Sequence, residues 1–321
     1  MSIPTGVWTQ LQKAETLLVH AGRSSRPELA RRVSEDFPLE GLDRVYLTRF
    51  FSGFDPTCIK ASDYHVRYPF STVEAIEQIL LRLSEKGILV PSEDGFALTQ
   101  SGTEIAMRWL ENAGTLLADL GGDRISEADV VALIEHDQRI LRSLAEPSNE
   151  LTTPILRHRS LGMQPEYDPP RLWHHWQLVW SMLAGAEDAQ EHVRKAMEIG
   201  PLEWFIGRQL WFVERRPWRA RAVRSSLYSI ANRYAPVGED DCLAAWSSLQ
   251  ADGWTDGDYD TPKLSVWGFE RRDEIEENVN RIFLSCWPKL SGSELAELTD
   301  LTSRLNRHLE EVMERCKQEV S

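Results

Sequence analysis

The densest group of residues able to bind an anion lies in ERRPWRARAVR, which covers residues 214–224. Its arginines are Arg215, Arg216, Arg219, Arg221 and Arg224. A guanidinium group donates several hydrogen bonds in one plane and matches the geometry of a phosphate. The cluster therefore predicts a phosphate clamp for a nucleic acid. The alternative is a solvated face whose arginines form ion pairs in an otherwise acidic chain.

A second group of distinctive residues is the run RLWHHWQLVWSMLAGAEDA at 171–189. Trp173, Trp176 and Trp180 are spaced by three and four positions, so they share one face of a helix. Their indoles are expected to pack in a core, and the alternative is a pocket for an aromatic or apolar ligand. The candidates for such a pocket are Trp173, His174, Trp176, Trp180, Trp211 and Trp287.

Residue patterns typical of catalysis or cofactor binding are missing from the sequence. The chain has no GxGxxG or GxxxxGK[ST] loop and no nucleophile with an evident base. His174 and His175 are not expected to ligate a metal or haem. The cysteines lack metal-binding spacing and are Cys58, Cys242, Cys286 and Cys316. We expect no enzymatic activity, no cofactor and no metal site.

Charge and hydropathy restrict the partners of the chain. The formal net charge of its 321 residues is −14, which repels nucleic-acid phosphates at long range. Any contact with DNA must therefore come from a local basic patch. No uncharged apolar run reaches about 18 residues, and MSIPTGVWTQLQKAE at the N-terminus lacks the pattern of a signal peptide. We expect a cytoplasmic protein without membrane contact.

The sequence also repeats itself. Aligning Arg67 with Arg233 pairs segment 67–112 with segment 233–278, and we call this shift the main offset. The identical pairs at the main offset include Gly87/Gly253, Leu98/Leu264 and Gly102/Gly268. Slightly smaller offsets extend the match backward through Ala21/Ala184 and forward through Arg139/Arg304, so the repeat spans about 8–144 and 171–309. We predict a first domain at 1–145, a proline-rich linker at 146–170 and a second domain at 171–321.

The first copy is expected to be mainly helical with one small β-hairpin. Apolar periodicity predicts helices over about 8–21, 28–35, 41–52 and 57–66. Ser71 or Thr72 is placed to cap the next helix, which ends near Lys86. The segment ILVPSEDGFALT at 88–99 predicts two short strands, and long helices follow over about 102–120 and 126–144.

Helix, turn, helix, hairpin and long helix is the order of a winged helix. The segments LSEKGILVPSEDGFALTQSG (83–102) and SLQADGWTDGDYDTPKLSVWG (248–268) resemble the wing region of MarR-type regulators. The closing helices at 102–144 and 268–312 are similar to those of the same family. The resemblance covers nearly the whole chain twice. It implies two tandem winged-helix units fused into an intrachain pseudo-dimer, which should be a monomer in solution.

The resemblance also implies a function. MarR-like proteins are transcription regulators that bind double-stranded DNA and hold small effectors beside their dimer interface. We expect DNA contacts from the first copy and the arginine cluster, and an aromatic or apolar effector. The candidate DNA-binding residues outside that cluster are Arg67, Thr72, Gln78, Arg82 and Lys86.

Both copies depart from the family where DNA would be touched. The wing tips, 92–95 and 256–260, carry carboxylates in place of the family's Asp-x-Arg pair, and the second recognition helix begins GEDD at 238–241. Carboxylates at these points would repel phosphate. The alternative function is a winged-helix scaffold that binds a protein partner or a small ligand instead of DNA. A DNA-acting enzyme is a minor alternative, because some DNA glycosylases carry tandem winged helices.

Overall fold

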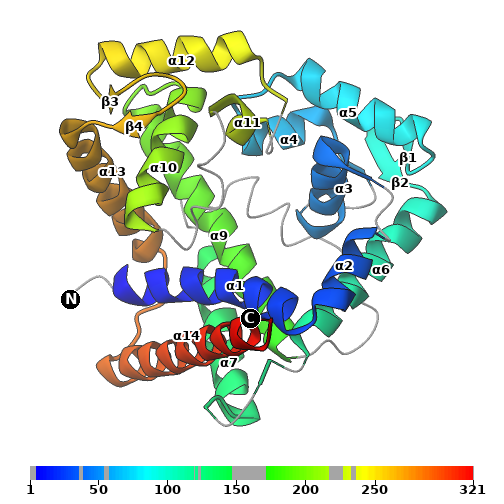
Figure 1. Ribbon diagram of the computed structural model, residues 1–321, viewed down its shortest axis with the longest axis vertical. Coiled ribbons are helices and arrows are strands. Elements are labelled where there is room, and N and C mark those ends of the chain that lie inside the picture. Colours follow the sequence, from blue (N-terminus) through cyan, green and yellow to red (C-terminus); the bar gives the residue numbers. More distant parts are fainter. Residues whose placement is uncertain are drawn as a thin grey trace. The chain divides into compact units, whose positions relative to one another are not determined.

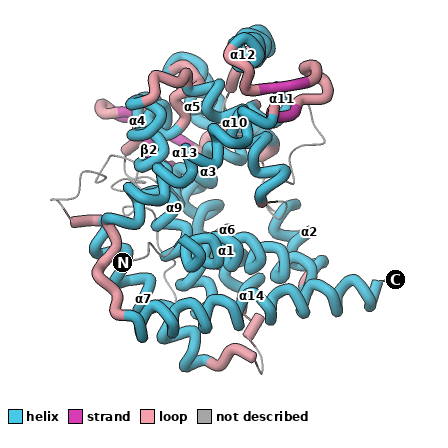
Figure 2. Tube along the Cα trace, turned by 90° about the vertical axis from the view of Figure 1, so that its left-hand side faces the viewer, coloured by secondary structure: helices cyan, strands magenta, loops and turns pink. Residues whose placement is uncertain are grey.

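The described part of the chain is mainly helical and carries two small antiparallel β-hairpins, as predicted (Figures 1 and 2). A computed structural model describes residues 5–35, 39–53, 58–118, 120–121, 124–146, 171–216, 227–232 and 236–320. The predicted linker lies almost entirely outside these residues. Among the helices of these ranges, none combines the length and the apolar composition that a membrane span needs.

The first half of the chain contains seven of the described helices and one hairpin. The helices are α1 (Thr5–Ser25), α2 (Pro27–Glu35), α3 (Gly41–Gly53), α4 (Ala61–Arg67), α5 (Val73–Glu85), α6 (Gln100–Leu117) and α7 (Glu127–Leu144). Strands β1 (Leu89–Ser92) and β2 (Gly95–Leu98) pair antiparallel, with Leu89 opposite Leu98. Each predicted element of this half is present, with its ends shifted by a few positions.

The second half repeats much of this order. Its helices are α9 (Arg171–Ala196), α10 (Pro201–Arg215), α11 (Leu227–Ala231), α12 (Glu239–Ala251), α13 (Val266–Ser285) and α14 (Gly292–Val320). Strands β3 (Thr255–Asp256) and β4 (Lys263–Leu264) form the second hairpin, with Thr255 opposite Leu264. The main offset carries both ends of α5 onto the ends of α12, so these two helices are equivalent in the repeat.

The hydrogen bonds around the two hairpins recur at the main offset. Thr99 Oγ1 donates to the Gly87 carbonyl at 2.7 Å and accepts from the Gly102 amide at 3.0 Å. Ser265 Oγ makes the equivalent bonds to Gly253 at 2.7 Å and Gly268 at 2.9 Å. Gly87 and Gly253 both end a helix with positive φ, 71° and 75°, where glycine avoids a steric penalty. Equivalent residues therefore make equivalent local bonds.

Contacts divide the chain into two compact units, and each takes segments from both halves. The first unit comprises Met1–Pro38, Thr103–Ala186 and Ile282–Ser321, and the second comprises Leu39–Gly102 and Glu187–Arg281. In the first unit, α1 lies along α14 (Figure 1). Trp8, which is 2% exposed, packs there against Phe283 and Trp287 with ring centroids 4.7 and 6.2 Å away.

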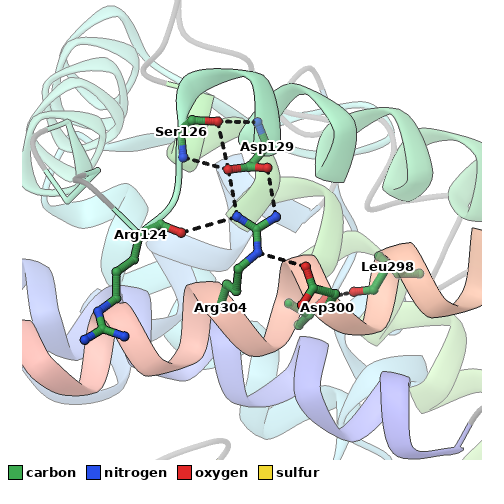
Figure 3. A network of polar contacts seen from close by, with 7 residues as sticks. Arg124, Ser126, Asp129, Leu298, Asp300 and Arg304 are labelled. Atoms are coloured by element: carbon green, nitrogen blue, oxygen red, sulfur yellow. Dashed lines mark hydrogen bonds and ion pairs between the residues drawn. The ribbon is translucent and has the colours of Figure 1, made fainter.

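Helices α7 and α14 of the first unit exchange reciprocal polar contacts. Arg304 donates to both carboxylate oxygens of Asp129 at 2.9 Å, as Figure 3 shows, and Arg139 pairs with Glu294. The alignment that pairs Arg139 with Arg304 also pairs Asp129 with Glu294. The Arg304 hydrogen bonds hold the pKa of Asp129 well below its usual value. Reciprocal contacts between equivalent residues are the signature of a two-fold interface.

A second pair of reciprocal contacts joins each of these helices to the loop before the other. A side chain of α7 contacts a carbonyl in the loop before α14, and a side chain of α14 contacts a carbonyl in the loop before α7. Ser143 Oγ donates to the Cys286 carbonyl at 2.9 Å, and His308 Nε2 lies 2.7 Å from the Leu120 carbonyl. Ser143 aligns with His308 in the repeat, and Leu120 aligns with Cys286 at the main offset. The long helices of the two halves therefore meet with matching residues on both sides.

Replacing Gly268 with alanine should destabilise the second hairpin. Gly268 lies in the first turn of α13, and an added Cβ would overlap the Trp254 carbonyl oxygen. Overpacking of this kind costs about 1–3 kcal/mol. Chemical denaturation would measure it, with Gly292→Ala as control, because an added methyl at Gly292 meets no atom within 4 Å. A Gly268→Ala protein as stable as the parent would contradict the close approach.

Candidate functional site

The cations of α5 that were predicted to touch DNA are engaged by one carboxylate. Arg82 and Lys86 place their nitrogens 2.9 and 2.7 Å from the two carboxylate oxygens of Asp43 on α3. The Asp43 side chain is 10% exposed, whereas those of Arg82 and Lys86 are about half exposed. Both cations therefore form ion pairs with a single carboxylate that is largely buried.

The other candidates of the first copy have mixed environments. Thr72 caps α5 by accepting a hydrogen bond from the Ala75 amide at 3.1 Å, and Gln78 is exposed on the same helix. Arg67 has a side chain that is 6% exposed and lies 3.2 Å from the Glu187 carboxylate. A buried and paired guanidinium cannot reach a phosphate without breaking its pair. Gln78 thus differs from the other candidates of this copy. It is exposed, and its side chain neither caps a helix nor forms an ion pair.

The residues that precede the two helices α5 and α12 meet inside the second unit. Ser71 Oγ donates to the Pro236 carbonyl at 2.5 Å. Thr72 caps α5 and Gly238 caps α12, so this bond lies one residue before one cap and two before the other. The N-terminal ends of the two helices are therefore close together. Helix α12 adds three carboxylates in its first turn, those of Glu239, Asp240 and Asp241.

Both hairpin tips are acidic, as the sequence predicted. In the first hairpin, the Asp94 carboxylate lies 3.7 Å from Lys60 Nζ. In the second, Asp258 Oδ1 accepts hydrogen bonds from the Thr261 hydroxyl and the Thr261 and Asp260 amides. The Thr261 bonds lower the pKa of Asp258. This carboxylate is therefore ionised at neutral pH and shapes its own loop.

The arginine cluster is only partly visible, because Arg219, Arg221 and Arg224 lie outside the described residues. Arg215 is ion-paired with Asp273 at 2.6 Å. Arg216 is buried, and its guanidinium lies 5.0 Å from the centre of the Trp211 ring. Arg215 therefore corresponds to the ion-paired alternative, whereas Arg216 is buried against an aromatic ring and belongs to neither a solvated face nor an open clamp.

A buried charge group that the sequence analysis missed lies beside this cluster. Arg272, 1% exposed, pairs with Glu276 at 2.5 Å and stacks on Trp204, with its guanidinium carbon 4.3 Å from the ring centre. Burial lowers the pKa of Arg272 to about 10. The signal was present in the sequence, since Arg272 and Glu276 fall on the apolar face of α13 with Ile275 and Val279.

Two of the three tryptophans of the stripe on α9 are buried as expected, and Trp180 is half-buried. Trp173 is 2% exposed and Trp176 is 9% exposed. Trp173 and Trp176 stack with ring centroids 4.8 Å apart, and Trp176 and Trp180 stack at 5.4 Å. The other pocket candidates have different neighbours. Trp287 packs on Trp8, Trp211 donates its indole N–H to Asp273 at 2.7 Å, and His174 is half-buried.

One buried polar pair stands beside the tryptophan stack, and the sequence analysis missed it. His175 Nδ1 lies 2.5 Å from Asp137 Oδ2, and both side chains are fully buried. Burial raises the pKa of the Asp137 carboxyl, and the charge of the neighbouring His175 opposes this shift. Asp137 occupies an apolar position of α7 between Leu133 and Ile140, so periodicity alone could have marked it. No family model, no curated protein and no solved structure matches the chain.

Proposed function

We propose that the chain is a fused pair of MarR-like winged-helix units. The hairpin hydrogen bonds that recur at the main offset support two copies of one unit. The reciprocal pairs Arg304–Asp129 and Arg139–Glu294 support a two-fold relation between their closing helices. A pseudo-dimer satisfies the family's dimer interface within one chain, so the protein is a monomer in this proposal.

We further propose that this scaffold binds a small ligand or a protein partner instead of duplex DNA. The observation that carries the proposal is the double ion pair of Asp43 with Arg82 and Lys86. A phosphate that recruited these cations would leave the Asp43 carboxylate buried and unpaired, which is costly. The same carboxylate would then repel the phosphate. The cations of α5 thus contribute little to DNA affinity.

The geometry of the two helix starts supports the same conclusion. A two-fold helix-turn-helix protein inserts its recognition helices into major grooves about 34 Å apart, with the N-terminal residues on the bases. The hydrogen bond between Ser71 and Pro236 keeps the starts of α5 and α12 together. The acidic first turn of α12 would also meet phosphates with like charge.

A salt-titrated duplex-binding assay tests this proposal. We expect no measurable binding of random duplex DNA by the parent, even at low salt. Asp43→Asn should gain weak, salt-sensitive binding, because it releases Arg82 and Lys86. Glu77→Gln is the matched control, since it removes the same charge from an exposed position of α5. Sequence-selective binding by the parent at physiological salt would overturn the proposal.

The second candidate is the DNA-binding transcription regulator. It is favoured by the order of helices and hairpins, which is that of a DNA-reading winged helix. In this case the contacts must come from Gln78 and from the arginines at 219, 221 and 224. Arginine contacts to phosphate would give the duplex assay a salt slope close to one unit per contact. The same experiment therefore separates the two candidates.

A further inference from the structure

The second unit contains a pocket of about 680 Å³ beside the second hairpin. It is lined by the turn between α9 and α10, the end of α12, the residue before β3 and the start of α13. Its volume lies in the range of small-molecule sites, which is roughly 300–1,000 Å³. None of the residues singled out in the sequence analysis as site candidates lines it.

Two tryptophans line this pocket, together with the aliphatic side chains of Met197, Ile199 and Leu249. Trp254 is 8% exposed, and Trp267 is 48% exposed. Their rings meet edge to face at 89°, with centroids 5.7 Å apart. Val266, the neighbour of Trp267 in the chain, is 77% exposed. An indole held in place by a second ring while half of its surface faces solvent offers a ready stacking surface.

The charged side chains of the pocket are mostly acidic. Five carboxylates line it, those of Glu198, Glu203, Asp252, Glu270 and Glu274. Arg271 is the only cation among the lining residues, and its guanidinium pairs with Glu274 at 3.0 Å. The remaining carboxylates give the pocket a negative field next to an aromatic surface. That combination selects an organic cation, because ammonium groups bind both carboxylates and the faces of indoles.

Glu198 has an unusual backbone conformation at the pocket wall. It is the one non-glycine residue with positive φ in the described chain, at 55°. Its amide bonds to Lys195 O, and the next amide bonds to Arg194 O, which closes α9 in the manner that normally takes glycine. A glutamate at this position costs stability that a glycine would not. A strained residue at a pocket is a reason to look for a binding role.

We propose that this pocket binds a small organic cation with more than one positive charge. One ammonium group lies against the face of Trp267, and the others pair with the carboxylates that include Glu198, Glu203 and Glu270. This inference rests on the proposed ligand-binding role and names the class of ligand. The test of the cation proposal uses no DNA. A failure to bind the cation is therefore distinguishable from a failure of the proposed function, which duplex binding by the parent would show.

Isothermal titration calorimetry with spermidine tests the proposal on the full chain. The parent should bind spermidine and should not bind a neutral diol of similar length. Trp267→Ala should weaken binding roughly 2- to 30-fold, the range expected for one cation–π contact. Glu270→Gln should also weaken it. Glu277→Gln is the matched control, because Glu277 is exposed on the same helix but does not line the pocket.

The variant Glu198→Gly separates a binding role of Glu198 from a purely structural one. The glycine should raise the melting temperature, because it relieves the positive φ, and should lower the affinity for spermidine at the same time. No spermidine binding by the parent would overturn the proposal, as would equal binding by the parent, Trp267→Ala and Glu270→Gln. Binding of a lysine-rich peptide without binding of spermidine would also overturn it, in favour of a protein partner.

Discussion

Replacing Trp173 with alanine is expected to lower the free energy of unfolding by about 3–5 kcal/mol. The indole is 2% exposed and stacks on Trp176 at 4.8 Å, so its removal leaves a cavity and also ends a ring stack. Truncation of a fully packed tryptophan combines the lost transfer free energy with the cost of that cavity. Urea denaturation followed by circular dichroism would measure the loss.

Trp267→Ala is the matched control for this experiment, because Trp267 is 48% exposed and makes one edge-on contact with Trp254. Its loss should cost clearly less than that of Trp173, because about half of its surface is already exposed and no closed cavity is left. If Trp173→Ala cost no more than the control, the stripe would be loosely packed. An aromatic acid that quenched indole fluorescence in the parent and lost this effect in the variant would then favour the pocket alternative.

Replacing Asp137 with alanine should be comparably damaging. It would leave His175 buried without its partner, and removal of one member of a buried polar pair costs about 3–5 kcal/mol. The neighbouring side chains offer little relief, because Leu133 and Ile140 on the same face of α7 are apolar. The measurement is again the free energy of unfolding, compared with Glu135→Ala at an exposed position of α7.

Asp137→Asn separates the hydrogen bond from the charge. The amide oxygen can still accept from His175 Nδ1, so this variant should be clearly more stable than Asp137→Ala. Burial raises the pKa of the Asp137 carboxyl, so the folded chain holds its proton more tightly than the unfolded chain. The stability of the parent relative to Asp137→Asn should therefore fall as the pH rises above about 4. Equal stability of the alanine and asparagine variants would show that the bond to His175 contributes nothing.

The sequence alone determined the local architecture of this protein. The cap at Thr72, the helix end at Gly87 and the turn between β1 and β2 depend on bonds between residues a few positions apart. Short sequence patterns predict such local bonds, so the helices and hairpins lie close to their predicted bounds. The glycines that the main offset pairs, Gly87/Gly253 and Gly102/Gly268, take part in local bonds that occur in both halves. The acidic hairpin tips followed directly from composition.

The tertiary structure decided which charges have partners. Nothing near Arg82 in the sequence indicates that it forms an ion pair with Asp43, which lies 39 residues away. The burial of Arg216 on Trp211, the Asp137–His175 pair and the gathering of carboxylates around Trp267 also depend on tertiary packing. Periodicity can place a polar residue on an apolar face, but it cannot name the helix that covers that face. Pairing depends on how distant helices pack, and it decides which arginines remain available to a ligand.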